Sequence, residues 1–203
     1  MKKYVVCLLS LVCLLWPGAM RAQSRAEEVV AALSAQMRAL KGYEIGFEVA
    51  MGEYRSTGSY SVSGDGYYLT MGNNEVFADG STRFEVSHDR REITIGRTDP
   101  DSRNILDNPV RAFDFLGSEY APSLLWERGG EAAVLLKPAA SGGVFAGDIT
   151  LVVAVPSLRP HSIAYDFDGE RITVRILRFE PFAGPLPAFD RAACPDYEWI
   201  DFR

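Results

Sequence analysis

The chain has 203 residues, 47% of them hydrophobic and 24% charged, and its formal net charge at pH 7 is −6. This length and composition predict one globular domain with a sizeable core. The acidic balance argues against nucleic acid as a partner, because phosphates attract clustered Lys and Arg, and it argues equally against electrostatic docking on anionic lipid.

The N-terminus has the pattern of a secretory signal peptide. Lys2 and Lys3 precede an apolar run from Tyr4 to Trp16, and small Ala22 offers a cleavage point. As a membrane anchor, this run of about 13 residues would reach only about 20 Å as a helix, short of the ~30 Å hydrocarbon core. We therefore expect residues 1–22 to be removed and residues 23–203 to form the mature domain in the periplasm.

Removal of this segment changes the charge and the cysteine content. It takes away three basic residues, Lys2, Lys3 and Arg21, which lowers the formal net charge from −6 to −9. Cys194 is then the one cysteine left, so no internal disulfide can form and the fold must be held by its core.

The mature chain is expected to open with a helix from Ala26 to Leu40, which Gly42 ends. Its apolar residues follow helical spacing and include Leu33 and Met37. This face can pack permanently against the core, or it can belong to a movable lid. Both interpretations stay open at this point.

The strongest strand pattern follows directly. Apolar residues alternate with Glu44, Gly46, Glu48 and Ala50, which predicts a strand with one buried face; the apolar residues are Tyr43, Ile45, Phe47, Val49 and Met51. Further strands are expected at Arg55–Ser63 with Tyr60 and Val62 on one face, Tyr67–Met71, Glu75–Ala78, Ser81–Val86 and Glu92–Gly96. Short turns such as Asp79-Gly80 make these strands antiparallel.

The pattern changes in the middle of the chain. Thr98–Asn108 is polar, and Val110–Leu116 is expected to form a short helix that carries Phe113 and Phe115. Strands then resume at Ala132–Lys137, Asp148–Val155, His161–Phe167 and Arg171–Phe179, and a last one is expected near Trp199–Phe202. Between these, Glu180–Pro187 contains three prolines and should wrap along the sheet. The result is an α+β architecture with a strongly curved sheet.

We find no residues spaced as a catalytic or metal-binding site would require. His88 and His161 lack neighbouring ligands, and Asp99, Asp101 and Asp107 do not follow the calcium-loop pattern. Glu44 and Glu48 share a strand face, but it is the face opposite the apolar row. We therefore expect a protein that is not an enzyme and that uses no metal or cofactor.

Several segments, in order, resemble the LolA-like periplasmic carriers of outer-membrane lipoproteins. They are "LKGYEIGFEV", "GSYSVSGDGYYLTM", "EVFADGSTRFEV", "EITIGRTDPD" before "NPVRAFDFL", and "LPAFDRAACPDYEWIDFR". The resemblance covers nearly the whole mature chain and is greatest to the shorter-tailed members from Bacteroidetes-like bacteria. It implies an incomplete, half-open antiparallel β-barrel of about eleven strands, with the helices as a lid over an apolar cavity.

The resemblance also implies a function. It suggests a monomeric chaperone that binds the acyl chains of lipoproteins and carries them from an inner-membrane lipoprotein-releasing transporter to an outer-membrane acceptor. The cavity wall would comprise Tyr43, Ile45, Phe47, Val49, Met51, Tyr60, Val62, Leu69 and Met71, and the lid would contribute Leu33, Met37, Phe113 and Phe115. The same apolar row could instead be core, filled by the two helices.

One departure from the family concerns gating. Proteobacterial carriers have an Arg-Pro pair after the strand that matches Ser59–Ser63, and the arginine holds the lid closed; here Gly64 and Asp65 occupy those positions. Two rival functions stay open. One is a sensor or accessory module on the same fold that binds lipid or lipoprotein; the other is a hydrolase, which would require distant carboxylates to converge.

Overall fold

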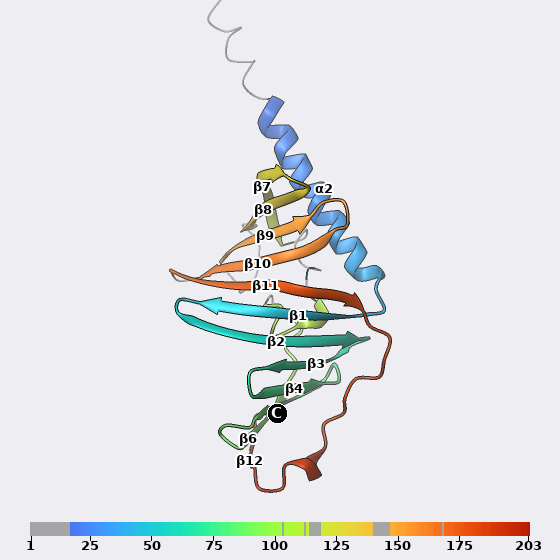
Figure 1. Ribbon diagram of the computed structural model, residues 1–203, viewed down its shortest axis with the longest axis vertical. Helices are drawn as coiled ribbons and strands as arrows, with labels where there is room; N and C mark the ends of the chain where they lie inside the picture. Colours follow the sequence, from blue (N-terminus) through green and yellow to red (C-terminus); the bar gives the residue numbers. More distant parts are fainter. Residues whose placement is uncertain (1–16, 103, 112, 114–118, 140–146, 168) are drawn as a thin grey trace, which may run out of the picture.

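Twelve strands in the described part of the chain form a single open sheet (Figure 1). The computed structural model describes residues 17–102, 104–111, 113, 119–139, 147–167 and 169–203. The strand order is β12-β6-β5-β4-β3-β2-β1-β11-β10-β9-β8-β7, so β12 and β7 lie at opposite edges. The strands are β1 Gly42–Met51, β2 Tyr54–Ser63, β3 Gly66–Met71, β4 Asn74–Ala78, β5 Thr82–Ser87, β6 Glu92–Arg97, β7 Tyr120–Arg128, β8 Glu131–Pro138, β9 Asp148–Ala154, β10 Arg159–Phe167, β11 Glu170–Pro181 and β12 Glu198–Asp201.

This architecture confirms the expected half-open α+β fold. The helix α2 spans Pro17–Ala39 and runs diagonally across the half of the sheet that contains β7 to β11 (Figure 1). It begins earlier than the expected Ala26 and therefore includes the expected cleavage position after Ala22. Val29, Val30 and Leu33 of α2 are buried against the sheet.

The central strands follow the alternation read from the sequence. β1 pairs with β2 on one side and β11 on the other, over nine or ten residues each, with one register shift between Gly46 and Phe47 in the β11 pairing. Directly paired residues share a face of the sheet. We call the face that carries Ile45 and Phe47, and that α2 covers, the inner face; the opposite face is the outer face.

The segment between β6 and β7 differs from the expectation. The prediction of a helix at Val110–Leu116 is wrong for the residues of this segment that the structure describes. Among them, the structure has only a 3-10 turn at Pro109–Arg111, and Phe113 has a φ of 67°. A positive φ cannot continue a right-handed helix, so the element ends by that residue. Residues 112 and 114–118 lie outside the described part, and with them Phe115.

Two edge strands also differ from the expectation. β7, Tyr120–Arg128, was not expected as a strand. It contains Pro122, and its pairing with β8 has a register shift between Leu124 and Trp126. Both features break the period-two pattern. β12 lies close to the expected position but pairs in parallel with β6, which the long tail before it permits.

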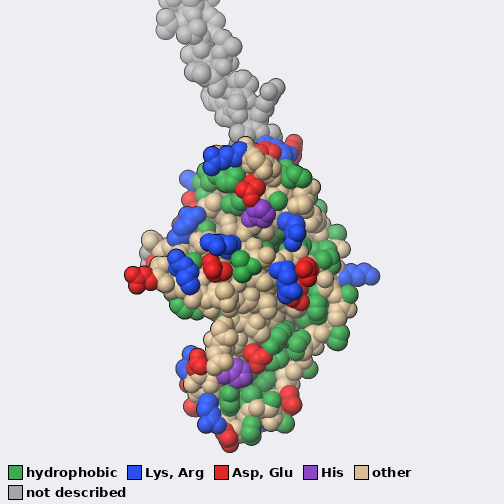
Figure 2. Space-filling view, viewed as in Figure 1, with side chains coloured by type: hydrophobic (Ala, Val, Ile, Leu, Met, Phe, Trp, Pro, Cys, Tyr) green, Lys and Arg blue, Asp and Glu red, His purple; other side chains and the backbone are tan. Residues whose placement is uncertain are grey.

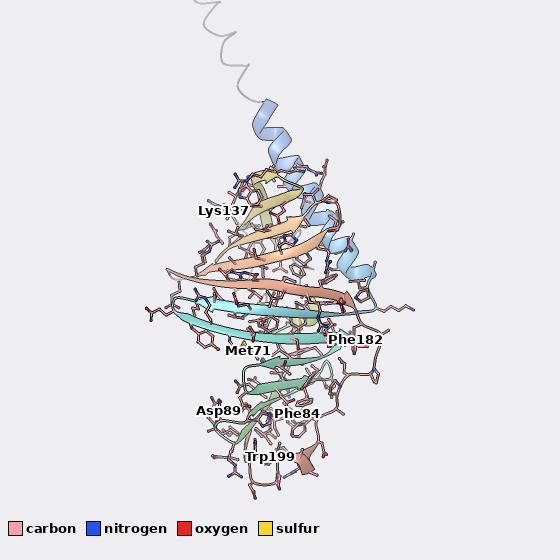
Figure 3. All side chains as sticks on the ribbon, viewed as in Figure 1. Met71, Phe84, Asp89, Lys137, Phe182 and Trp199 are labelled. Atoms are coloured by element: carbon pink, nitrogen blue, oxygen red, sulfur yellow. The ribbon has the colours of Figure 1, made fainter. Side chains whose placement is uncertain are left out.

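The C-terminal segment, residues 182–203, covers the outer face of β4 to β6. Phe189 stacks on Phe84 with 4.5 Å between ring centroids and packs edge-on against Trp199 at 5.8 Å. Figure 3 shows Phe84 and Trp199 together at this end of the sheet. A second core forms here from Val86, Ile93, Ile95 and Cys194.

Candidate functional site

The inner face of the sheet is an apolar surface that α2 and the segment after β6 cover. Of the nine residues expected in the wall, seven are buried in one continuous cluster: Tyr43, Ile45, Phe47, Val49, Tyr60, Val62 and Leu69. The neighbouring strands extend this surface with Val134, Leu151, Ile163 and Val174. The apolar row of β1 therefore continues across the sheet from β3 to β8.

The remaining expected site residues have different positions. Met71 is half-buried and packs against the edge of the cluster, while Met51, at the end of β1, is 39% exposed. Leu33, Met37 and Phe113 lie in the same cluster as the wall. In this conformation the residues expected in the wall and in the lid pack directly against one another.

We call the described residues 99–102, 104–111 and 113, which lie between β6 and β7, the insert. Ile105 and Phe113 are fully buried in the inner-face cluster. Asn108, also buried, donates a side-chain hydrogen bond of 3.1 Å to the carbonyl of Asp99. The insert thus covers the apolar surface with irregular backbone instead of a second sheet.

Hydrogen bonds from side chains hold the backbone of the insert. The Tyr43 hydroxyl donates to the carbonyl of Pro109, and the Tyr67 hydroxyl donates to that of Asp107 at 3.0 Å. From α2, the Ser34 hydroxyl donates to the carbonyl of Phe113 at 2.7 Å. These bonds satisfy polar backbone groups that the apolar wall could not accommodate unpaired.

A fourth contact comes from the opposite half of the wall. The backbone amide of Ile105 donates to the Tyr165 hydroxyl on β10 at 3.2 Å. Because desolvation raises the pKa of Tyr67 to about 12 and raises that of Tyr165 further, both hydroxyls stay protonated and neutral at physiological pH.

Tyr60 differs from these tyrosines. It is 1% exposed, and its hydroxyl has no hydrogen-bond partner among the described residues. Desolvation, followed by the nearby Tyr43 and Tyr165 hydroxyls, raises its pKa well above the ordinary value of 10.0. Buried hydroxyls normally have a partner, so this one is a polar point in the apolar wall that no described residue satisfies.

A cavity of about 290 Å³ lies beside the insert, where the character of the inner face changes. Leu69, Val76 and Leu106 line one side of the cavity, and Arg83 and Glu85 line the other. Nε of Arg83 lies 3.3 Å from Oε1 of Glu85. The residues of β5 that face inward are charged or polar, because the apolar residues of this strand face outward under the C-terminal segment. The inner face therefore ends in a polar rim.

The outer face of the central strands is charged (Figure 2). Glu44 forms an ion pair with Arg178, and Glu48 lies 3.5 Å from Arg175. Both carboxylates thus lie on the face opposite the apolar row, as the alternation predicted. Their arginine partners come from β11, so these acids are paired across strands and do not point toward the apolar wall.

The two histidines also lie on the outer side. His88 bridges the Tyr197 hydroxyl and a Glu75 carboxylate oxygen, each at 2.9 Å, and His161 contacts Glu131 at 2.5 Å. Within the described ranges, no group of three or more His, Cys, Asp or Glu side chains could hold a metal ion. None of the helices described has both the length and the apolar character needed to cross a membrane.

Comparisons with known proteins identify similar folds. No protein-family model matches the sequence, and no curated protein matches it significantly. An uncharacterized conserved protein from Thermus thermophilus is similar in structure, with 8% identity over 86% of this chain and 98% of that chain and a TM-score of 0.54.

Two further solved structures have lower scores. A LolA superfamily protein from Nitrosomonas europaea has 11% identity over 79% of this chain and 94% of that chain, with a TM-score of 0.40. The MucA/MucB complex of Pseudomonas aeruginosa has 17% identity over 81% of this chain and 59% of that chain, with a TM-score of 0.41. A LolA superfamily protein is among the structural neighbours of this chain. The likeness to the Thermus thermophilus protein is one of fold.

Sequence reasoning missed the contacts of the tyrosines with the insert. A signal for them existed, because Tyr43, Tyr67 and Tyr165 stand at buried strand positions where Phe or Leu would pack as well. A buried tyrosine usually has a hydrogen-bond partner for its hydroxyl. Three buried tyrosines on one apolar face therefore indicate that a backbone segment with polar groups crosses that face.

Proposed function

We propose that this chain is a periplasmic carrier that binds the acyl chains of lipoproteins on the inner face of its sheet. One observation carries the proposal: a continuous apolar wall is covered by α2 and by an irregular insert attached through side-chain hydrogen bonds. A cover of this kind can leave without breaking the strand pairing of the sheet.

The free energies involved are comparable. Displacing the insert exposes the fully buried Ile105 and Phe113, at about 1.5–3 kcal/mol each, and also Pro109 and the partly buried Leu106 and Val110. It breaks four hydrogen bonds worth about 0.5–1.5 kcal/mol each. A chain of about 15 methylene groups gains on the order of 12 kcal/mol when it leaves water, at ~0.8 kcal/mol per group. One chain therefore roughly offsets the loss, and two or three exceed it, which favours a diacylated or triacylated cargo.

The proposal includes the route of the cargo. The chain is exported, residues 1–22 are removed, and residues 23–203 act as a soluble monomer. An inner-membrane lipoprotein-releasing transporter would load it and an outer-membrane acceptor would unload it. In this account the protein shields acyl chains during transfer and performs no chemical reaction on them.

Binding measurements on a rim variant test the proposal. Met71 lies at the edge of the wall and is half-buried, so Met71→Asp places a charge in the path of an acyl chain (Figure 3). We expect the affinity for a diacylated lipopeptide to fall at least tenfold. The control is Leu177→Asp, because Leu177 is 59% exposed and does not belong to the inner-face cluster. The affinity of this control variant should equal that of the wild type.

Mass spectrometry of the protein purified gently from its native periplasm provides the second test. We expect acyl material that can be transferred to an acceptor membrane. A protein that contains none and does not bind the lipopeptide would refute the proposal. A stable complex with a signalling protein, without transferable cargo, would favour the sensor function instead.

A further inference from the structure

Three tyrosines lie side by side on the inner face, on consecutive strands. Tyr43 of β1 and Tyr67 of β3 are both paired with Val62, which lies between them on β2. Tyr60 is two residues from Val62 on the same strand and face, and its ring centroid is 6.1 Å from that of Tyr43. We call Tyr43, Tyr60 and Tyr67 the tyrosine row.

In the closed conformation two members of the row bind carbonyl oxygens. Tyr43 donates to the carbonyl of Pro109 and Tyr67 to that of Asp107, both in the backbone of the insert. Tyr60, buried between apolar neighbours, has no acceptor among the described residues. The row therefore presents three hydroxyl donors in an apolar environment, and two of them, Tyr43 and Tyr67, bind the insert.

The carbonyls that the row binds indicate which ligand could replace them. A peptide carbonyl and the carbonyl of an ester or amide are acceptors of the same kind, and a neutral phenolic hydroxyl donates to both. An alkyl chain has no such acceptor. If the insert leaves, Tyr43 and Tyr67 lose the carbonyls that they bind there, and Tyr60 still has no acceptor among the described residues. This is unfavourable in an apolar wall unless the incoming molecule supplies acceptors.

We propose that the hydroxyls of Tyr43, Tyr60 and Tyr67 bind the ester and amide carbonyls that join acyl chains to their head group, once the insert has been displaced. The inference rests on the proposed function and specifies its substrate class, which is an acyl ester or amide. The protein would distinguish such a ligand from an alkyl ether with chains of the same length, because the ether has no carbonyl. The insert backbone occupies the carbonyl positions in the absence of the ligand.

Tyr60→Phe tests the inference, because it removes only the unpartnered oxygen. The probes are a lipopeptide with two palmitoyl esters and its dihexadecyl ether analogue, each competing with a fluorescent acyl probe. The wild type should bind the diester more tightly than the diether. Tyr60→Phe should reduce that preference roughly 2- to 10-fold, the effect of one hydrogen bond, while its melting temperature stays the same or rises.

A second variant and a control separate binding from packing. Tyr67→Phe should also reduce the preference for the diester, but it should lower the melting temperature, because it leaves the carbonyl of Asp107 without its bond. Tyr54→Phe is the control, since Tyr54 lies exposed at the start of β2. Its preference should match that of the wild type.

The outcomes distinguish the two proposals. If the wild type binds diester and diether equally and neither variant changes the ratio, the tyrosine row has no role in recognition and the inference is overturned, while the proposed carrier function stands. If the wild type binds neither compound, the carrier function fails and the inference fails with it.

Discussion

At the residue scale, Gly58 is fixed by the packing of the wall. It lies on β2 opposite Phe47 of β1, and a Cβ atom there would overlap the carbonyl oxygen of Thr70 and lie 2.7 Å from Cζ of Phe47. Phe47 is fully buried at the centre of the inner-face cluster. The Phe47 ring can therefore occupy this position because residue 58 has no side chain.

We predict that Gly58→Ala destabilises the protein by about 1–3 kcal/mol, because an added methyl group in a filled core forces its neighbours apart. The free energy of unfolding in urea measures this. Gly96→Ala is the matched control, since a Cβ at that strand position would meet no atom within 4 Å. Equal stability of the two variants would contradict the packing described for Phe47.

At the element scale, the insert and the C-terminal segment cover opposite faces of the sheet by different means. The insert is attached by hydrogen bonds to its backbone, and its buried apolar side chains include Ile105, Pro109 and Phe113. The C-terminal segment contributes Phe189, Tyr197 and Trp199 to the second core and forms β12. The proposed carrier function therefore assigns movement to the insert and leaves the C-terminal segment in place.

The C-terminal segment should be sensitive to acid through Glu75. Burial alone would raise the pKa of Glu75, but hydrogen bonds from Tyr68 and His88 lower it below the ordinary value of 4.5. A carboxyl with a lowered pKa in the folded state contributes stability above pH 4.5, and that stability is lost as the pH falls through the lower, folded value. His88 connects this carboxylate to Tyr197 in the C-terminal segment.

We therefore predict that Glu75→Gln flattens the dependence of stability on pH below 4.5. Thermal unfolding of the variant and the wild type between pH 3 and pH 6 measures the difference. Near-UV circular dichroism, to which Trp199 and Tyr197 contribute, follows the loss of aromatic packing. Glu198→Gln, an exposed residue of β12, is the control. A wild-type slope in Glu75→Gln would show that this carboxylate does not contribute to acid sensitivity.

At the scale of the whole molecule, the sheet carries its apolar side chains on two different faces. From β1 to β3 and β8 to β11 they face α2 and the insert, whereas on β5 and β6 they face the C-terminal segment. The inner face is thus apolar over most of its width and polar at one end, where Arg83 and Glu85 line the cavity. A wall of this kind suits a molecule with long apolar chains and a polar group.

Local patterns predicted much of this fold. The alternation in β1 fixed the inner and outer faces, and Asp79-Gly80 placed the β4–β5 turn, in which the Asp79 carboxylate accepts from the amides of Ser81 and Thr82. The rest depends on contacts between segments far apart in the chain. The positive φ of Phe113 results from the docking of the insert, which no local pattern encodes. The tyrosines at buried strand positions indicate that polar backbone crosses the face, but they do not say which carbonyls they bind.

The central claim is that acyl chains replace the insert on the inner face. Hydrogen–deuterium exchange of the insert amides, with and without a saturating diacylated lipopeptide, tests it most directly. The amide of Ile105, bonded to Tyr165 in the closed state, should exchange faster when the lipopeptide is bound. Unchanged or slower exchange at Ile105 and its neighbours, with the lipopeptide demonstrably bound, would contradict the claim.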